Sequence, residues 1–221
     1  MQPAISAACS WSGGKDSCFA LIQAVQQGVI PKILLNMMNE GGQVSRTHGL
    51  TANLLQQQAD ALNLPIVTMP ASWQEYERKF LDIIEVIKIS YEVEAMIFGD
   101  IDLQAHRDWE EMVCGKTGIK AILPLWKKNR KDLLLKMLSD GMEAIIVSCN
   151  TLMGQDYLGE KLDLALIPEL EARGIDVCGE NGEFHTMVIN CSMFHNPVSV
   201  PPFLKTLHED YYMLQWPELG V

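Results

Sequence analysis

A short segment near the N-terminus combines the residue types that bind a phosphate group: Ser12, Gly13, Gly14, Lys15, Asp16 and Ser17. Adjacent glycines permit backbone conformations closed to other residues and let the chain approach an anion closely. Lys15 supplies a positive charge, and the two serine hydroxyls can hydrogen-bond to phosphate oxygens. Asp16 is suited either to cap a helix or to hold a magnesium ion. The segment predicts a site for a phosphorylated ligand.

A second group of chemically active side chains lies in residues 178–186, where Glu180 and Glu183 stand three apart in a glycine-bearing segment before His185. Two carboxylates on one turn can orient an amine or ammonium nucleophile, or bind magnesium. A histidine can accept a proton from attacking ammonia near neutral pH. A polar turn with solvated acids is the alternative interpretation.

Further candidates follow an apolar run that ends at residue 98. Gly99, Asp100 and Asp102 stand where a buried strand is expected to stop, so the carboxylates can hold magnesium or a substrate cation, or simply form a turn. His48, next to Gly49, and Arg107 are candidates for contact with a nucleotide, with a surface position as the alternative. His106, His195 and His208 are expected at the surface.

The elements that must position these residues alternate in type. Apolar runs at 4–10, 31–37, 65–69 and 95–98 predict buried strands, and residues 17–27, 50–62 and 73–91 have helical patterns between them. Strands that alternate with helices indicate an α/β fold with a parallel sheet covered on both faces. Ligands of such sheets bind beyond the carboxyl ends of the strands. The phosphate segment and Asp100 both stand at such ends, so we expect them to lie close together.

The pattern continues less regularly after residue 124. We expect a helix at 130–138, a strand at 144–149, a mostly helical stretch at 158–173 interrupted by Pro168, and a strand at 186–190. Four later prolines predict an extended tail. We therefore expect an ATP-binding domain at 1–125 and a smaller C-terminal α/β domain, which binds the substrate, at 126–221.

Composition limits the classes of partner. The 17 basic and 28 acidic residues give a net charge of −11, which disfavours nucleic acid unless the basic residues gather on one face. The basic residues at 127–131 form a run short enough to be the solvated start of a helix. No apolar run approaches the roughly 18 residues of a membrane span. Six cysteines without a C-x-x-C pair are expected to be core residues of a cytoplasmic protein. A homo-oligomer remains open.

The phosphate segment lacks the G-x-x-x-x-G-K-[ST] spacing of kinases and GTPases. It resembles instead the S-G-G-x-D-S signature of the PP-loop ATP pyrophosphatases, which cleave ATP between the α and β phosphates. That resemblance implies ATP as ligand, magnesium as cofactor, and AMP and pyrophosphate as products. An ordinary strand–turn–helix connection is the alternative to this interpretation.

Residues 178–186 resemble the C-G-E-G-G-E-[FY]-E-T signature of the diphthine–ammonia ligase family, as do residues 124–126, 158–159 and the spacing of Glu111 and Cys114. The resemblance extends from Ser12 to about Ile189. It implies a PP-loop fold of the adenine nucleotide alpha hydrolase type. It also implies that a carboxylate, that of diphthine on elongation factor 2, is adenylated, and that ammonia then displaces AMP.

The sequence also departs from the family pattern. Asn181 replaces a glycine, His185 replaces an acidic residue, and Gly99-Asp100-Ile101 stands where the family has G-A-I. The following Y-Q-x-x-R pattern is absent, since Ala105, His106 and Trp109 stand at its positions. These departures indicate a divergent branch, of the kind also found in bacteria, which do not make diphthamide.

Three other functions stay open beside the ammonia-dependent amide ligase. One is a PP-loop enzyme that acts on a small carboxylic acid, for example in cobalamin salvage. Another is a tRNA-modifying PP-loop enzyme, against which stand the acidic charge and the lack of paired cysteines. The third is a sensor that binds ATP without turnover, which the Lys15–Asp16 pair disfavours. At this length we expect no glutamine amidotransferase domain, so the nitrogen source would be free ammonia or a partner.

Overall fold

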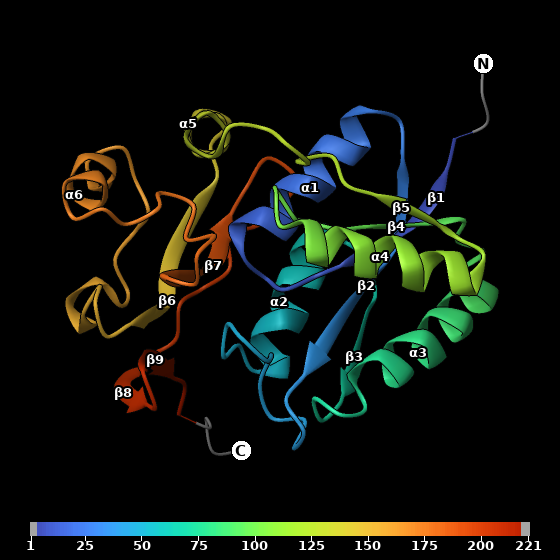
Figure 1. Ribbon diagram of the computed structural model, residues 1–221, viewed down its shortest axis with the longest axis horizontal. Coiled ribbons are helices and arrows are strands. Elements are labelled where there is room, and N and C mark those ends of the chain that lie inside the picture. The colour runs from blue at the N-terminus through green and yellow to red at the C-terminus, as the bar shows by residue number, and fades with distance from the viewer. Residues whose placement is uncertain (1–3, 218–221) are drawn as a thin grey trace.

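The computed structural model describes residues 4–217 and contains two sheets, one on the right and one on the left in the view of Figure 1. The first sheet is parallel, and its strands are β1 (Ser6–Ser10), β2 (Ile30–Met38), β3 (Ile66–Pro70), β4 (Ala95–Ile97) and β5 (Lys120–Ile122). Their spatial order is β3-β2-β1-β4-β5. The order reverses between β1 and β4, and ligands of open α/β sheets bind at such a reversal.

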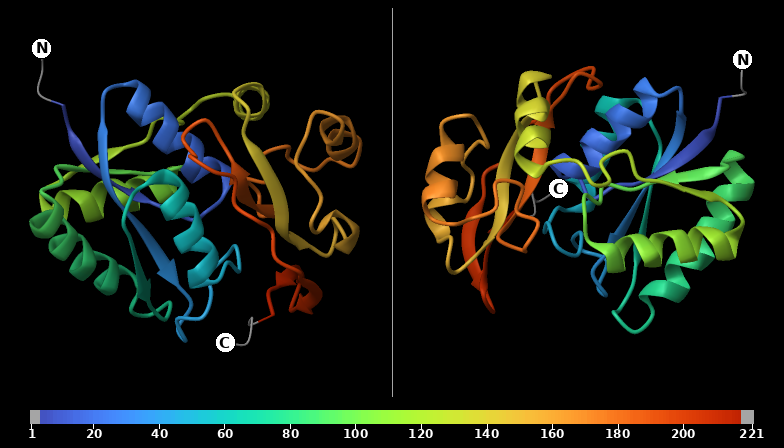
Figure 2. Two further views of the ribbon diagram at one scale, coloured as in Figure 1. Left: turned by 180° about the vertical axis from the view of Figure 1, so that it is seen from behind. Right: turned by 45° about the horizontal axis from the view of Figure 1, so that its top comes forward.

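Helices cover both faces of this sheet, as the sequence predicts. On one face lie α1 (Lys15–Gln26) and α2 (Ala52–Leu62); on the other lie α3 (Tyr76–Tyr91) and α4 (Gln104–Thr117) (Figure 2). Phe80, Ile84 and Ile87 of α3 are buried against Met96 and Phe98, which gives that face its own hydrophobic cluster. The other face forms a cluster that continues into the second sheet. The predicted α/β class is confirmed.

The second sheet is antiparallel, with the order β7-β6-β9-β8. Its strands are β6 (Glu143–Asn150), β7 (Phe184–Asn190), β8 (Leu204–His208) and β9 (Tyr211–Gln215). The helix α5 (Arg130–Ser139) precedes it, and a 3-10 turn (Gln155–Tyr157) and α6 (Leu166–Ala172) flank it. Asn129 caps α5, its side chain accepting from the Asp132 N–H at 3.1 Å.

Several elements differ from the sequence-based prediction. The helix α4 and strand β5 were not predicted; α4 buries only a narrow stripe, Glu110, Val113, Cys114 and Thr117, so its apolar periodicity is weak. Only residues 166–172 of the predicted helical stretch at 158–173 are α-helical. The predicted extended tail is wrong for 204–215, which pair as the β8–β9 hairpin. Pro197, Pro201 and Pro202 precede the hairpin and Pro217 follows it, so the prolines restrict only the segments that flank it. The outer limits of the two predicted domains, residues 1 and 221, lie outside the described residues.

Candidate active site

The phosphate loop joins the end of β1 to the start of α1, the context that the sequence predicts. Gly13 has φ +84°, and a Cβ built there would lie 2.5 Å from Leu50 Cδ1, so only glycine fits this position. Ser12 and Ser17 are placed to shape the loop: their hydroxyls lie 3.0 Å apart, and Ser12 Oγ accepts from the Gly14 N–H at 3.2 Å. Ser17 is also buried.

The second sheet holds this loop directly. The Lys15 N–H donates to Thr186 Oγ1 at 3.1 Å, and the Val188 N–H donates to the Gly13 carbonyl at 2.9 Å. Gln58 of α2 donates to the carbonyls of both Gly13 and Val188 at 2.9 and 2.8 Å. Gln58 is fully buried, and no motif in the sequence singles it out. Strand β7 therefore fixes the backbone of the phosphate loop.

Lys15 and Asp16 form a partly buried ion pair at the start of α1, with side chains that are 4% and 27% exposed. Lys15 Nζ lies 2.7 Å from Asp16 Oδ2 and also donates to the carbonyl oxygen of Cys178. Burial lowers the pKa of the Lys15 ammonium, but Asp16 and its other neighbours outweigh burial and raise that pKa above its ordinary value. Asp16 Oδ1 is buried without a hydrogen-bond partner. A cation with a free coordination position would satisfy this oxygen.

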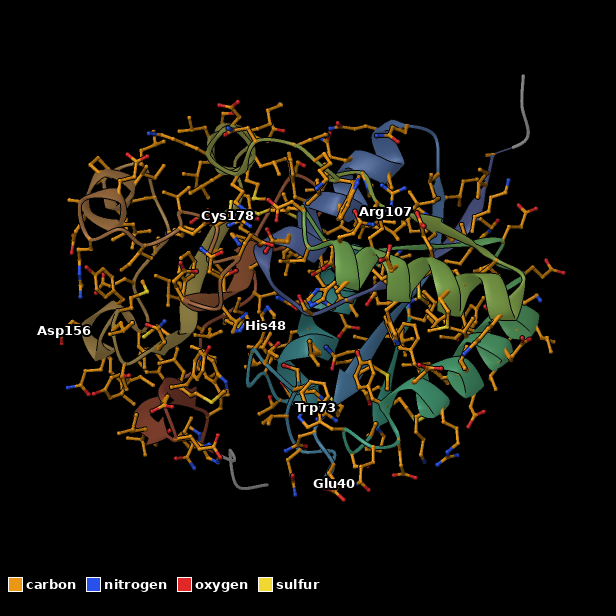
Figure 3. All side chains as sticks on the ribbon, viewed as in Figure 1. Glu40, His48, Trp73, Arg107, Asp156 and Cys178 are labelled. Atoms are coloured by element: carbon orange, nitrogen blue, oxygen red, sulfur yellow. The ribbon has the colours of Figure 1, made fainter. Side chains whose placement is uncertain are left out.

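A cavity of about 320 Å³ opens beside this pair, and it collects residues from both domains. In Figure 3, His48 lies where the two parts of the molecule meet, with Cys178 above it. The predicted candidates that line the cavity are Lys15, Asp16, His48, Asp100, Glu180 and His185; His106, Gly179 and Thr186 join them. The His106 side chain is 59% exposed, as the sequence predicts for a surface residue, and it also forms part of the cavity wall.

Glu180 and Glu183 have different environments. Glu180 lines the cavity, where burial and Asp16 raise the pKa of its carboxyl to about 7 against the opposing effect of Lys15. Glu183 is turned back into its own turn, where it accepts from the N–H groups of Asp176 and Asn181 at 3.1 and 3.0 Å. Glu183 therefore shapes the turn that carries Glu180, and the structure does not bring its carboxylate to the cavity.

Asp100 and His106 form another part of the cavity wall, and Glu110 lies beside Asp100. Asp100 Oδ1 accepts from His106 Nδ1 at 2.6 Å, and Glu110, one helical turn after His106 on α4, also pairs with Asp100. Burial first, and then Asp100, raise the pKa of Glu110 to about 10. Burial acts to raise the pKa of Asp100, but its hydrogen bonds with His106 and Glu110 outweigh this effect and keep that pKa below its ordinary value. Near neutral pH, Asp100 is thus ionised and Glu110 is a neutral acid.

Two imidazoles form a third part of the wall. The rings of His48 and His185 have centroids 4.7 Å apart. Burial lowers the pKa of His48 well below its ordinary value and that of His185 to about 4, and the positive charge of Lys15 acts in the same direction. Both rings are therefore neutral at pH 7. They act as hydrogen-bonding groups there, which does not fit the expectation that His185 titrates near neutrality.

A second, smaller hollow of about 150 Å³ continues the site past His48, at the carboxyl ends of β1 and β2. Its lining includes Trp73 and Tyr76, and the guanidinium of Arg46 lies 4.2 Å from the Trp73 ring centroid. Asn36 donates to the Trp11 carbonyl at 2.7 Å, while its Oδ1 is buried without a partner. Aromatic rings beside an amide oxygen without a hydrogen-bond partner suit a planar heterocycle such as a purine.

The remaining candidates lie outside the cavity. Gly99 packs against α1, since a Cβ there would lie 2.7 Å from the Ser17 backbone nitrogen. Asp102 is paired with Arg130 at 2.7 Å, and Arg107 with Glu111 at the same distance.

Within residues 4–217, no three His, Cys, Asp or Glu side chains are grouped closely enough to hold a metal ion by themselves. No helix of the described chain is long and apolar enough to cross a membrane. All six cysteines are buried and free, as expected.

The fold and this site define a nucleotide-binding α/β protein of the PP-loop class. Comparison with protein families gives the family: the diphthamide synthase N-terminal domain matches residues 5–121, and the diphthamide synthase C-terminal domain matches residues 130–216. This chain belongs to the diphthamide synthase family. The predicted family is thereby confirmed.

Individual relatives agree with this assignment. A diphthine–ammonia ligase of Bos taurus is 30% identical over 217 residues, which cover 86% of this chain and 80% of that protein. The diphthine–ammonia ligase of Homo sapiens is 27% identical over 89% of this chain and 83% of its own length. The Schizosaccharomyces pombe protein of the same name is also 27% identical, but only 34% of its length is covered. The predicted class of enzyme, an ATP-dependent ligase, agrees with these names.

Proposed function

We propose that this protein is an ATP-dependent amide ligase, which activates a carboxylate as an acyl-adenylate and lets ammonia displace AMP. The observation that carries the proposal is the cavity shared by the two domains. Lys15 and Asp16 of the phosphate loop line it from one side and Glu180 from the other. Such an arrangement can hold a triphosphate, an acceptor and a nucleophile together, which is the main requirement for a two-step transfer.

ATP is proposed to span the two hollows that meet at His48. Its base would occupy the hollow beside Trp73 and Asn36, and its phosphates would reach the loop at Lys15. Lys15 would stabilise the negative charge that develops as pyrophosphate leaves, because a preorganised cation in a water-poor site acts strongly on such charge. His48 and His185, as neutral donors and acceptors, would orient the phosphates without adding charge.

Magnesium is the cofactor that ATP chemistry implies. The cavity offers carboxylate oxygens that could bind it. Asp16 and Asp100 both line the cavity, and the unpartnered Asp16 Oδ1 is the oxygen best suited to bind the ion. Since magnesium usually keeps several waters and phosphate oxygens among its ligands, one protein carboxylate is sufficient. The ion supplies charge neutralisation for the phosphates. Asp100 has one oxygen engaged by His106, so we give it the secondary role.

The acceptor and the nucleophile would enter from the Glu180 side. Ionised Glu180 can take a proton from ammonia as its nitrogen bonds to the acyl carbon and AMP leaves, because the pKa of about 7 of this carboxyl lies near physiological pH. The carboxylates of Glu180 and Asp100 also favour a cationic group on the acceptor, such as the trimethylammonium of diphthine on elongation factor 2. Free ammonia is the proposed nitrogen source.

Two further assignments accompany this function. We keep an ATP-binding domain at residues 1–125 and a substrate-binding domain at 126–221; β5 ends at Ile122 and α5 begins at Arg130 on either side of that division. We propose the cytoplasm as the compartment, since free cysteines are usual in reducing surroundings.

Product analysis tests the proposal. The protein is incubated with ATP, magnesium, ammonium and elongation factor 2 that carries diphthine, and the nucleotides are separated by chromatography. We expect AMP and pyrophosphate, and mass spectrometry of the acceptor should show conversion of the acid to the amide. ADP as the main product would overturn the chemistry. AMP formation with small carboxylic acids, but not with elongation factor 2, would keep the chemistry and change the acceptor.

A further inference from the structure

Arg130, the first residue of α5, joins the two domains at a point behind the cavity. Its Nη2 and Nε donate to the two carboxylate oxygens of Asp102 at 2.7 and 2.8 Å. Its Nη1 donates to Asp176 Oδ2 at 2.5 Å and lies 3.3 Å from Asn181 Oδ1. Asp102 belongs to the loop after β4, whereas Asp176 and Asn181 belong to the turn before β7. One guanidinium therefore ties a loop of each domain to the other.

The geometry of these contacts demands arginine. A planar guanidinium can donate two parallel N–H groups to one carboxylate and a third N–H group to a second carboxylate. A lysine ammonium lacks this fixed arrangement of donors and cannot replace it. The side chains of Arg130, Asp102 and Asp176 are 23%, 29% and 14% exposed, so water screens the network only in part. This network of Arg130, Asp102 and Asp176, which we call the Arg130 bridge, is therefore held more firmly than an ordinary surface ion pair.

The backbone around Arg130 adds to the bridge on both sides. The Cys178 thiol donates to the Arg130 carbonyl at 3.0 Å, and the Cys178 N–H donates to Asp176 Oδ1 at 2.7 Å. On the other side, the Lys127 N–H donates to the Ile101 carbonyl at 2.7 Å, which holds the linker before α5 against the loop after β4. The loop of Asp100 and the turn of Glu180 are thus fixed to one segment.

This segment connects the Glu180 side of the cavity with the Asp100 side. Glu180 lies two residues beyond Cys178, whose carbonyl accepts from Lys15, and Asp100 lies two residues before Asp102. Arg130 itself is not among the residues that line the cavity. It can therefore act in two ways: through the residues that it positions, and through its charge, which acts to lower the pKa of Glu180.

We propose that Arg130 is a positioning residue, which sets the separation of the Glu180 turn and the Asp100 loop across the cavity. This inference rests on the proposed function for its effect on turnover. Small displacements of reacting groups are costly, since a misplacement of about 1 Å can slow a reaction by about 100-fold. ATP binding depends on the phosphate loop and the hollow at Trp73, neither of which Arg130 contacts, so it is spared.

The first test compares Arg130→Gln with Lys131→Gln. Lys131 is the next residue of the same helix and forms an exposed ion pair with Glu171 at 2.7 Å, so it is a matched loss of one charge. R130Q should lower kcat for AMP formation at least about tenfold and leave the ATP dissociation constant within about threefold. K131Q should leave both within about twofold. Equal kcat for R130Q and wild type, or an equal loss in ATP binding, would overturn the proposal.

The second test separates positioning from mere loss of fold. Asp102→Asn removes the other half of the bridge at a more exposed site, and it should lower kcat in the same direction. The double variant R130Q/D102N should be no slower than R130Q alone, because the bridge is already lost, and additive effects would contradict this. Arg130→Lys, which keeps the charge, should recover only part of kcat; recovery to the wild-type value would show that charge alone is needed and would refute the positioning role.

Hydrogen exchange of the wild type, D102N and R130Q, read on the peptide that covers residues 174–185, tests the geometry without any turnover. We expect faster exchange of this turn in both variants and no change in the peptide of β1. If the wild type forms no AMP with any acceptor, the proposed function fails while the exchange result still tests the bridge. Unchanged exchange in both variants would overturn the bridge, whatever the activity.

Discussion

The backbone N–H of Lys15 donates to the hydroxyl of Thr186 at 3.1 Å, across 171 residues of sequence. Two residues further along the same strand, the Val188 N–H donates to the Gly13 carbonyl at 2.9 Å. The phosphate loop and the strand after the Glu180 turn are therefore one hydrogen-bonded unit. A change that moves the backbone of either segment is therefore expected to move the other.

Replacement of Lys15 by Ala should weaken ATP binding. A charge-assisted hydrogen bond of a buried group contributes about 1.5–3 kcal/mol, so the dissociation constant should rise roughly 10- to 150-fold. The variant should also unfold at a lower temperature, since Asp16 loses its partner. Isothermal titration with ATP and thermal unfolding measure the two effects. Lys131→Ala, at an exposed lysine, is the control, and an unchanged ATP affinity in K15A would refute a phosphate role for Lys15.

Glu180→Gln should slow turnover without loss of ATP binding. Removal of a general base typically costs about 100-fold or more, while the ATP dissociation constant should stay within about threefold. The wild-type rate should rise with pH through the Glu180 pKa of about 7, because only the ionised carboxylate accepts a proton. In E180Q this rise should vanish when the rates are compared at a fixed concentration of unprotonated ammonia. Rates of AMP formation across the neutral range, beside titration with ATP, decide the matter; an unchanged pH profile would exclude Glu180 as the base.

Glu183→Gln is the matched variant on the same turn, and it should act through stability. The amide loses the charge that holds the N–H groups of Asp176 and Asn181, a loss of about 1–3 kcal/mol in the free energy of unfolding. Turnover per folded molecule should remain within about tenfold of wild type. Urea unfolding and the same AMP assay report the two quantities. A loss of turnover as large as in E180Q, in fully folded protein, would return Glu183 to the catalytic group.

Glu110→Gln should change how stability depends on pH. The folded-state pKa of Glu110 is about 10, above its unfolded value, so folding retains a proton that the unfolded chain releases from about pH 4.5 upward. Wild-type stability contributed by this group is thus complete at low pH and is lost as the pH rises toward 10, by at most about 1.4 kcal/mol per pH unit. Because a Gln amide still donates to Asp100, E110Q should gain stability relative to wild type as the pH rises.

Urea unfolding at acidic, neutral and basic pH measures this difference. Glu111→Gln is its control: the neighbouring residue is exposed and paired with Arg107, and its replacement should leave the slope with pH unchanged. A constant difference between E110Q and wild type at every pH would mean that Glu110 ionises normally in the folded protein.

Gly99→Ala should destabilise the site by displacing the start of α1. The added Cβ would lie 2.7 and 2.8 Å from backbone atoms of Ser17 and Asp16, which cannot move without shifting the start of α1. Overpacking of this kind costs about 1–3 kcal/mol, and ATP affinity should fall with it. Gly115→Ala in α4, where a Cβ meets nothing within 4 Å, should instead be neutral or stabilising. Equal stability of the two variants, measured by urea unfolding, would refute the close contact.

The sequence by itself determined the elements that depend on local pattern. Alternating apolar and amphipathic runs gave the parallel sheet, and the phosphate loop was recognisable because glycine freedom, a lysine and a strand–helix junction are all local properties. The C-terminal hairpin was missed because prolines indicate only where regular structure stops. The helix α4 was missed because its buried stripe contains Glu110 and Thr117 among few apolar residues.

Only the tertiary structure decided which carboxylates face the cavity. Glu180 and Glu183 are equivalent in the sequence pattern, but hydrogen bonds within the turn take up Glu183 and leave Glu180 free to line the site. Asp100, His106 and Glu110 meet because a strand end and a helix converge, and Arg130 reaches two domains at once. The Arg130 contacts join residues 28 and 46 positions apart in the chain. The pKa shifts at the site arise from burial and from hydrogen bonds, and both are properties of the assembled fold rather than of any one segment.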